Sequence, residues 1–241
     1  MDVAARYRYV YKPLVWVACL LPLAWLACGA LGWLGVTLGA DPVKKLEHSA
    51  GRTALNLLLL TLAVTPVREL ARLPDLVRLR RLLGLFAFFY AALHFAIWLT
   101  LDLELNFGMV AADIGRRPYL TIGFTALLLL VPLAITSTNR MMRRLGRRWQ
   151  RLHRLVYAIG LLGVWHFYWQ VKRDVREPLL YAGILGALLA WRAIRARARS
   201  PRPESLARRA PGPGPHGQSS HIDVRICQSS GKNLSSRALA R

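Results

Sequence analysis

The chain has 241 residues, of which 54% are hydrophobic, and a formal net charge of +22 at pH 7. Its mean hydropathy is +0.30, and long apolar runs alternate with short charged ones. This composition excludes an ordinary water-soluble domain. The positive charge alone would fit a nucleic-acid-binding protein, but its distribution along the chain argues against one.

Six apolar runs are long enough, or nearly so, for membrane helices, which need about 20 mainly apolar residues each. The second run is the weakest, because Pro66 falls near its end, where we expect it to close the helix. A bilayer admits only helices or closed barrels, and these runs are too long and continuous for barrel strands. We therefore predict an all-α membrane protein with six transmembrane helices, at about residues 13–35, 52–67, 82–101, 118–137, 155–171 and 178–194.

The basic residues indicate the orientation of these spans. If the N-terminus is inside, the three inner segments that precede the last span carry fifteen Lys and Arg residues. The outer loops carry seven, together with seven Asp and Glu residues. This positive-inside bias predicts a cytoplasmic N-terminus and a cytoplasmic C-terminus. Contact with anionic lipid, a flavin phosphate or a haem propionate is the alternative use of the arginines.

The first run also resembles a signal peptide, but its apolar stretch is longer than the usual core of about 7–15 residues, so we expect it to remain as a span. Cys19 and Cys28 lie nine residues apart on that helix, too far for a disulfide. No C-x-x-C motif and no nucleotide-binding motif occurs, and we find no internal repeat at a fixed period.

The composition changes near residue 200, where Pro, Gly, Ser and Arg replace large apolar residues. Such a segment buries too little surface to offset the entropy of ordering. We predict a six-helix transmembrane domain at 1–199 and a disordered cytoplasmic tail at 200–241. His216 and His221 lie in this tail and are expected to be solvated.

Two histidines lie at nearly one depth within the apolar runs. His94 follows Arg81, which marks the inner end of the third span, by 13 residues, or about 20 Å of helix. His166 follows Arg154, at the inner end of the fifth span, by 12 residues, or about 18 Å. In a hydrocarbon core about 30 Å thick, both imidazoles reach the outer half of the membrane.

Ionisable residues inside a span indicate function by default. Two neutral imidazoles at equal depth can bind a haem iron from opposite sides, which predicts a haem within the helix bundle. Ala87 and Ala91 share the face of His94, and Gly163 shares that of His166, so small residues leave room for a flat macrocycle. Ordinary helix packing around hydrogen-bonded histidines is the alternative.

Two further histidines are harder to assign. His153 precedes His166 by 13 residues, which places the two about 140° apart on a straight helix. The residue 13 before His94 is Arg81, so a second haem lacks its obvious partner. His153 is thus either an iron ligand or a group that orients a propionate, flavin or quinone. His48, before the second span, is expected to have a structural or quinone-facing role.

At these residues the chain resembles the MsrQ (formerly YedZ) family, the haem-binding membrane subunits of methionine sulfoxide reductase systems, within the wider ferric-reductase-like transmembrane group. The similarity covers about residues 6–195. It rests on the segments LGADPVKKLEHSAGRTALNLLL, RLRRLLGLFAFFYAALH, RRPYLTIG, AITSTN and LGRRWQRLHRLVYAIGLLGVWHFYW.

The resemblance implies a bacterial inner-membrane protein that binds haem b and FMN. It implies an electron-transfer subunit that takes electrons from the quinone pool. These electrons pass to a periplasmic molybdopterin enzyme, MsrP, which reduces methionine sulfoxide in oxidised proteins, so the catalytic step is in the partner. By motif position, the residues matching the family's haem-associated ones are His94, His153, His166, Arg80 and Arg81.

Two other functions remain open. One is a ferric reductase or oxidase served by a separate flavin reductase, although no domain for FAD or NAD(P)H is evident in this chain. The other is a non-enzymatic membrane scaffold with structural histidines. The wider group often carries two histidines on the third span, where this chain has one.

Overall fold

The computed structural model describes residues 7–35, 38–72, 74–171 and 174–199, and these residues form helices joined by turns. The predicted tail, with His216 and His221, lies outside them. Short π-helical turns occupy Tyr7–Tyr11 and Trp98–Asp102. The helices are α2 (Lys12–Ala30), α3 (Pro42–Ala71), α4 (Leu79–Ile97), α5 (Phe107–Arg116), α6 (Pro118–Ile135), α7 (Asn139–Leu145), α8 (Arg147–Leu152), α9 (Leu155–Gln170) and α10 (Arg176–Arg199).

Five helical segments of the described residues are long and apolar enough to cross a membrane. They include α2, α3, α4, α6 and α10, which correspond to five of the six predicted runs. The remaining run forms α9, which has 16 residues and is about 24 Å long, somewhat less than a hydrocarbon core. The molecule is therefore an all-helical membrane protein. The helix α9 is shorter than the five helical segments long enough to cross a membrane.

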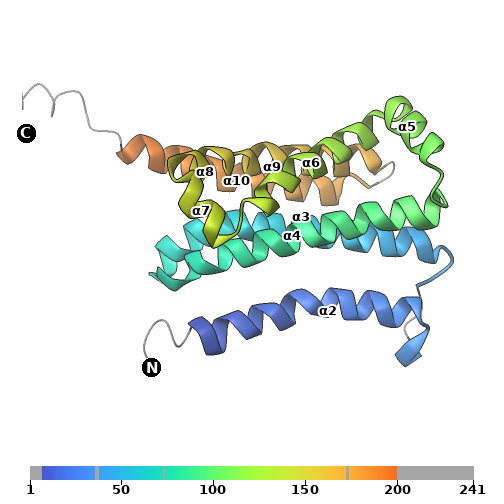
Figure 1. Ribbon diagram of the computed structural model, residues 1–241, viewed down its shortest axis with the longest axis horizontal. Coiled ribbons are helices and arrows are strands. Elements are labelled where there is room, and N and C mark those ends of the chain that lie inside the picture. Colours follow the sequence, from blue (N-terminus) through green and yellow to red (C-terminus); the bar gives the residue numbers. More distant parts are fainter. Residues whose placement is uncertain (1–6, 36–37, 73, 172–173, 200–241) are drawn as a thin grey trace, which may run out of the picture. The chain divides into compact units, whose positions relative to one another are not determined.

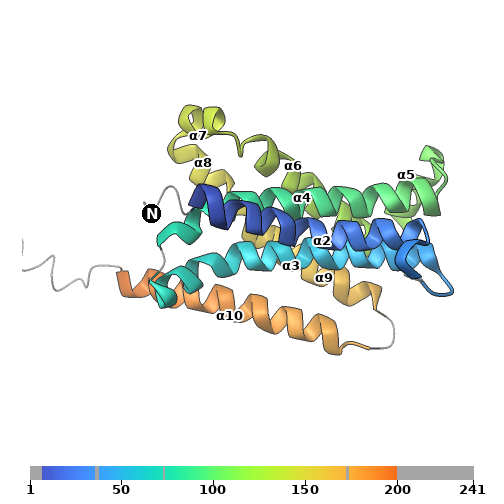
Figure 2. The same ribbon diagram turned by 90° about the horizontal axis from the view of Figure 1, so that it is seen from below.

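The helix α3 is packed against α4 along most of its length, and α6 is packed in the same way against α9. Figures 1 and 2 show α3 between α2 and the layer formed by α9 and α10. Leu62, Tyr90 and Ile159 are fully buried where these helices meet. The Tyr90 hydroxyl donates a hydrogen bond of 2.6 Å to the carbonyl of Cys19, which ties α2 to α4. Cys19 and Cys28 are both free thiols, as their spacing predicts.

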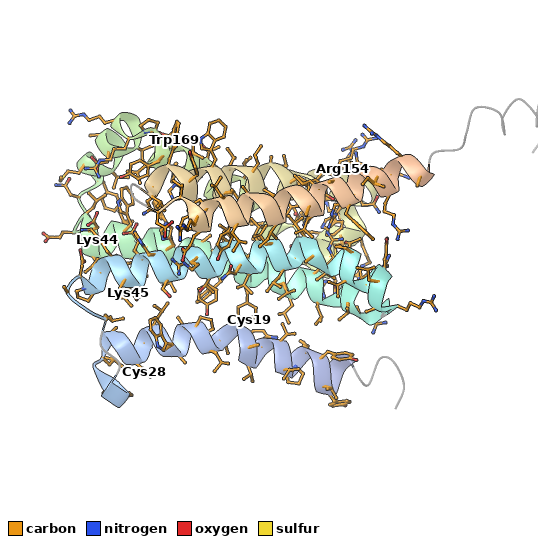
Figure 3. The ribbon with its side chains drawn as sticks, turned by 180° about the vertical axis from the view of Figure 1, so that it is seen from behind. Cys19, Cys28, Lys44, Lys45, Arg154 and Trp169 are labelled. Atoms are coloured by element: carbon orange, nitrogen blue, oxygen red, sulfur yellow. The ribbon has the colours of Figure 1, made fainter. Side chains whose placement is uncertain are left out.

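The two ends of the bundle carry different short helices. Figure 1 shows α7 and α8 at the end where α2 begins and α10 finishes, and α5 at the opposite end. Figure 3 shows Lys44, Lys45 and Trp169 toward the α5 end and Arg154 toward the other. The outward faces of the long helices carry exposed apolar side chains such as Leu14, Val17 and Leu21, which suits contact with lipid.

The expectation that Pro66 closes the second span is wrong, because α3 continues to Ala71 and ends at Arg72 with a left-handed φ of 53°. A proline lacks the N–H that would bond the carbonyl four residues earlier, here that of Leu62. The Arg192 guanidinium of α10 donates to this carbonyl over 2.8 Å. The helix therefore continues, since a distant side chain satisfies the group that Pro66 leaves free.

Candidate functional site

A cavity of about 440 Å³ lies between α3, α4, α6 and α9, and its lining also includes Glu177 of α10. This volume is within the range of about 300–1,000 Å³ that is usual for ligand sites. Its walls are mainly apolar, and small residues such as Ala54, Ala87, Ala91 and Gly163 keep it open. The prediction that small residues leave space beside the two histidines is confirmed for this cavity.

His94 of α4 and His166 of α9 face one another across the cavity. Their ring centroids are 6.2 Å apart and their planes make an angle of 73°. A metal–imidazole bond is about 2 Å long, so two imidazoles on opposite sides of one metal ion have ring centroids roughly 6 Å apart. The separation of the two rings therefore fits a single ion held between them.

Each imidazole is held by a backbone carbonyl of a neighbouring helix. Nδ1 of His94 lies 2.9 Å from the carbonyl oxygen of Glu47 in α3, and Nδ1 of His166 lies 2.7 Å from that of Tyr119 in α6. A carbonyl only accepts hydrogen bonds, so Nδ1 carries the proton in both rings. Nε2 then keeps its lone pair, which is the tautomer that metal-ligating histidines use.

The donor set suits haem iron better than a metal ion held by protein groups alone. Within the part of the chain that the structure describes, no group of three or more His, Cys, Asp or Glu side chains is placed to bind a metal ion. The facing pair, His94 and His166, thus offers two nitrogen ligands beside an apolar space. A porphyrin supplies the four remaining ligands of a six-coordinate iron, so the residues present fit a haem with two axial imidazoles.

His153 lies apart from this cavity. It caps the C-terminus of α8, so it is not on α9, and its ring stacks on Trp149 with the centroids 3.9 Å apart. Its Nδ1 bonds the Trp149 carbonyl at 3.1 Å, and its Nε2 is buried with no hydrogen-bond partner among the described residues. Burial lowers the pKa of His153, which favours a neutral imidazole.

The arginine pair lies on the first turn of α4, near His153 and away from the cavity lining. Arg81 donates to the side-chain oxygen of Asn139 and contacts the sulfur of Met142 at 3.7 Å. Arg80 is half-buried, and its charge also lowers the pKa of His153, less than burial does. The structure therefore places two of the five predicted site residues, His94 and His166, at the cavity. The other three, His153, Arg80 and Arg81, lie outside its lining.

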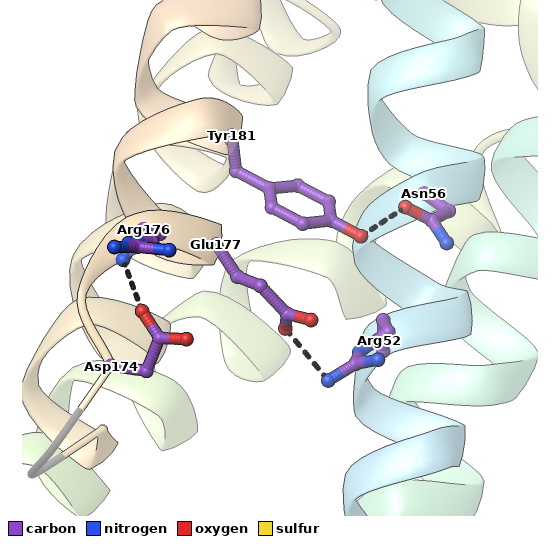
Figure 4. A network of polar contacts seen from close by, with 6 residues as sticks. All are labelled: Arg52, Asn56, Asp174, Arg176, Glu177 and Tyr181. Atoms are coloured by element: carbon purple, nitrogen blue, oxygen red, sulfur yellow. Dashed lines mark hydrogen bonds and ion pairs between the residues drawn. The ribbon is translucent and has the colours of Figure 1, made fainter.

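Several polar side chains also line the cavity. His48 of α3 lies in the cavity lining, with its Nε2 3.2 Å from the amide nitrogen of Gln170. Arg52 forms an ion pair of 2.8 Å with Glu177 of α10, and Figure 4 shows this pair beside the hydrogen bond from Tyr181 to Asn56. The sequence analysis did not assign Arg52 or Gln170, because each is one polar residue at the edge of a long apolar run.

Comparison with known proteins places this arrangement in a class. Residues 50–164 match the family model of the ferric reductase like transmembrane component. This range includes His94 and most of the residues that line the cavity, but it begins after Glu47 and His48 and ends before His166. Residues 50–164 thus form a ferric-reductase-like transmembrane domain. No solved structure matches the chain.

Two relatives identify the family within this class of transmembrane proteins. The chain is 54% identical to the protein-methionine-sulfoxide reductase heme-binding subunit MsrQ of Xanthomonas oryzae pv. oryzae (strain MAFF 311018) over 192 residues, which are 76% of this chain and 86% of the relative. It is 51% identical to MsrQ of Bordetella pertussis (strain Tohama I / ATCC BAA-589 / NCTC 13251) over 186 residues, 75% of this chain and 87% of the relative. The chain belongs to the MsrQ family, which confirms the resemblance found in its sequence.

Proposed function

We propose that this protein binds haem between His94 and His166 and serves as the membrane electron-transfer subunit of a methionine sulfoxide reductase. The observation that carries this proposal is the pair of carbonyl-tethered imidazoles with centroids 6.2 Å apart at an apolar cavity. The relatives named as heme-binding subunits support it.

The residues of the chain have separable tasks in this function. Nε2 of His94 and Nε2 of His166 would hold the iron, and the two backbone carbonyls keep both rings in the ligating tautomer. Bound haem supplies a one-electron redox change at its iron. Since His94 and His166 would both hold the iron, we expect electron transfer rather than oxygen chemistry. The apolar walls exclude water and keep both imidazoles neutral.

The haem is proposed to be of the b type, bound without a thioether link. The sequence has no C-x-x-C-H attachment motif, which supports this proposal. FMN, a quinone donor and a periplasmic MsrP-type molybdopterin acceptor are proposed from the family resemblance. In this scheme methionine sulfoxide reduction, and thus protein repair, takes place in the partner.

His153, Arg80 and Arg81 are proposed as further haem-associated residues on the inner side. The buried Nε2 of His153, without a hydrogen-bond partner among the described residues, supports a bond that forms only in the loaded protein. Because none of the three lines the cavity, we propose this role at a different point from that of His94 and His166.

We further propose six spans with both termini in the cytoplasm of a bacterium, across its inner membrane, with α9 as the sixth span and residues 200–241 as a disordered tail. The arginine-rich helices α7 and α8 lie at the end where α2 begins and α10 finishes, which supports this orientation. The cavity lining includes Gln170, which follows Trp169 at the opposite end, so electrons would leave toward the periplasm.

Oriented membrane vesicles test this function. With reduced quinone and an MsrP-type reductase on the periplasmic face, the haem spectrum should show reduction by quinol and reoxidation by the acceptor with its sulfoxide substrate. Reoxidation only by acceptor on the cytoplasmic face would overturn the orientation. A colourless purified protein would contradict haem binding and favour a scaffold.

A further inference from the structure

The two histidine tethers have the same spacing along the chain. His94 bonds the carbonyl of the residue 47 positions before it, and His166 does the same. Both histidines and both carbonyls are therefore separated by the same interval of 72 residues. The sequence shows a weak repeat at this interval, in which GRTALNLL at residues 51–58 and GFTALLLL at residues 123–130 agree at six of eight positions.

Hydrogen bonds and cavity-lining residues repeat at the same interval as the sequence. Thr53 donates to the Ser49 carbonyl at 2.8 Å, and Thr125 donates to the Thr121 carbonyl at 2.7 Å. All but four of the residues that line the cavity form pairs separated by this same interval of 72 residues. The cavity is thus built from two similar halves, one formed by α3 with α4 and the other by α6 with α9.

Each half has a glycine four residues after the tethering carbonyl. In an α-helix the Cα–Cβ bond tilts toward the N-terminus, so the side chain at position i+4 covers the carbonyl of residue i. At Gly51 and Gly123 no side chain is present, and the carbonyls of Glu47 and Tyr119 remain open to a second donor besides their helical N–H.

The space above each glycine is taken by an imidazole. A Cβ atom on Gly51 would lie 3.0 Å from Nδ1 of His94. A Cβ atom on Gly123 would lie 2.7 Å from both Nδ1 and Cε1 of His166, closer than real Cβ contacts come. The rings are rigid and lie against the helix backbone, so a methyl group at either position must displace the imidazole or the helix.

We propose that the cavity consists of two equivalent half-sites, and that Gly51 and Gly123 are positioning residues that set the tautomer and orientation of the iron ligands His94 and His166. The proposal rests on the proposed function, in which these histidines hold haem. In each half-site the glycine exposes a carbonyl, the carbonyl binds Nδ1, and Nε2 is thereby directed into the cavity.

Alanine substitution tests this role with matched controls. Gly51→Ala and Gly123→Ala are compared with Gly84→Ala, whose Cβ would meet only a methyl carbon at 4.0 Å, and Gly186→Ala, whose Cβ would meet nothing within 4 Å. Alanine is the better helix former, so helix propensity alone predicts a more stable protein in all four variants.

We expect Gly51→Ala and Gly123→Ala to weaken haem binding by about 10–100-fold, as loss of a hydrogen bond to a metal-ligating histidine does. The loss should be greater for Gly123→Ala, where the contact is closer. The haem that remains should show an altered low-spin spectrum and a shifted midpoint potential. Both controls should bind haem as the wild type does.

Thermal unfolding of the full chain in detergent, without haem, gives a second readout. Gly123→Ala should lower the Tm when His166 is present and should not lower it in a His166→Ala background, where the ring is absent. If His94→Ala and His166→Ala lose haem while both glycine variants keep wild-type affinity, spectrum and Tm, the positioning role is wrong and the proposed function stands. If the histidine variants keep full low-spin haem, the proposed function itself is wrong.

Discussion

The guanidinium of Arg192 in α10 donates a hydrogen bond of 2.8 Å to the carbonyl of Leu62 in α3, and this carbonyl is free because the residue four positions later is Pro66. Arg192 also bonds the Tyr157 hydroxyl and the Thr65 hydroxyl. One half-buried cation thus joins α3, α9 and α10 at a point where a proline would otherwise leave a polar group unsatisfied in a membrane.

Replacing Arg192 by Ala should destabilise the bundle by about 1–3 kcal/mol, the usual cost of leaving a buried polar group unsatisfied. In a Pro66→Ala background the restored N–H bonds the Leu62 carbonyl, so the same substitution should cost less, with a coupling of about 1 kcal/mol. Unfolding in mixed detergent measures both values. Equal costs in the two backgrounds would show that Arg192 acts through other contacts.

The Arg52–Glu177 ion pair should contribute much less to the free energy of unfolding than the hydrogen bonds of Arg192 do. Both side chains are about half exposed, at 50% and 51%, and exposed pairs contribute roughly 0.2–1 kcal/mol. Arg52→Ala should therefore change the free energy of unfolding by less than about 1 kcal/mol, with an effect that shrinks as salt rises. The same unfolding assay checks this prediction, and a loss as large as that of Arg192→Ala would refute it.

Tyr90→Phe should weaken the attachment of α2 to α4 and lower the free energy of unfolding. The Tyr90 hydroxyl is buried and bonds the Cys19 carbonyl at 2.6 Å, so its removal should cost about 0.5–1.5 kcal/mol. Protease sensitivity of the α2–α3 connection and detergent unfolding measure the change. Tyr168→Phe, at a tyrosine that is 45% exposed, is the control and should be neutral. Equal behaviour of the two variants would exclude a special role for Tyr90.

His153→Ala should lose less haem than substitution of His94 or His166, because His153 does not line the cavity. A change in the haem spectrum with most pigment retained is the expected result, measured as the ratio of haem to protein and by the reduced spectrum. A complete loss of pigment from a folded protein would place His153 among the principal ligands.

Truncation after Arg199 should leave haem content and electron transfer near wild-type values, since the composition of residues 200–241 gives them little apolar surface to bury. Pigment content of the truncated protein checks this. A bleached but folded truncated protein would contradict the predicted disorder of the tail.

The meeting of His94 and His166 could be predicted from the sequence, because the rise of a helix converts a count of residues into a depth in the membrane. The continuation of α3 beyond Pro66 could not, since the compensating group, Arg192, is 126 residues further along the chain. Local rules for proline describe the helix alone and carry no information on such a partner.

The internal repeat is hard to predict from the sequence, because its one continuous stretch of similarity is only eight residues long. Outside residues 51–58 and 123–130 the two halves agree at scattered positions, such as His94 with His166 and Phe95 with Phe167. These positions stand out only once the structure shows which side chains share the cavity. The two glycines had an available signal, since each begins a G-x-T-A-L segment located 43 residues before a histidine.

The central claim, that one haem is held between His94 and His166, is tested most directly by the pigment of purified single-histidine variants. The His94→Ala and His166→Ala proteins should each lose most of their low-spin haem. The His48→Ala protein, altered at another residue of the cavity lining, should retain it. Full low-spin haem in both of the first two variants would contradict the claim.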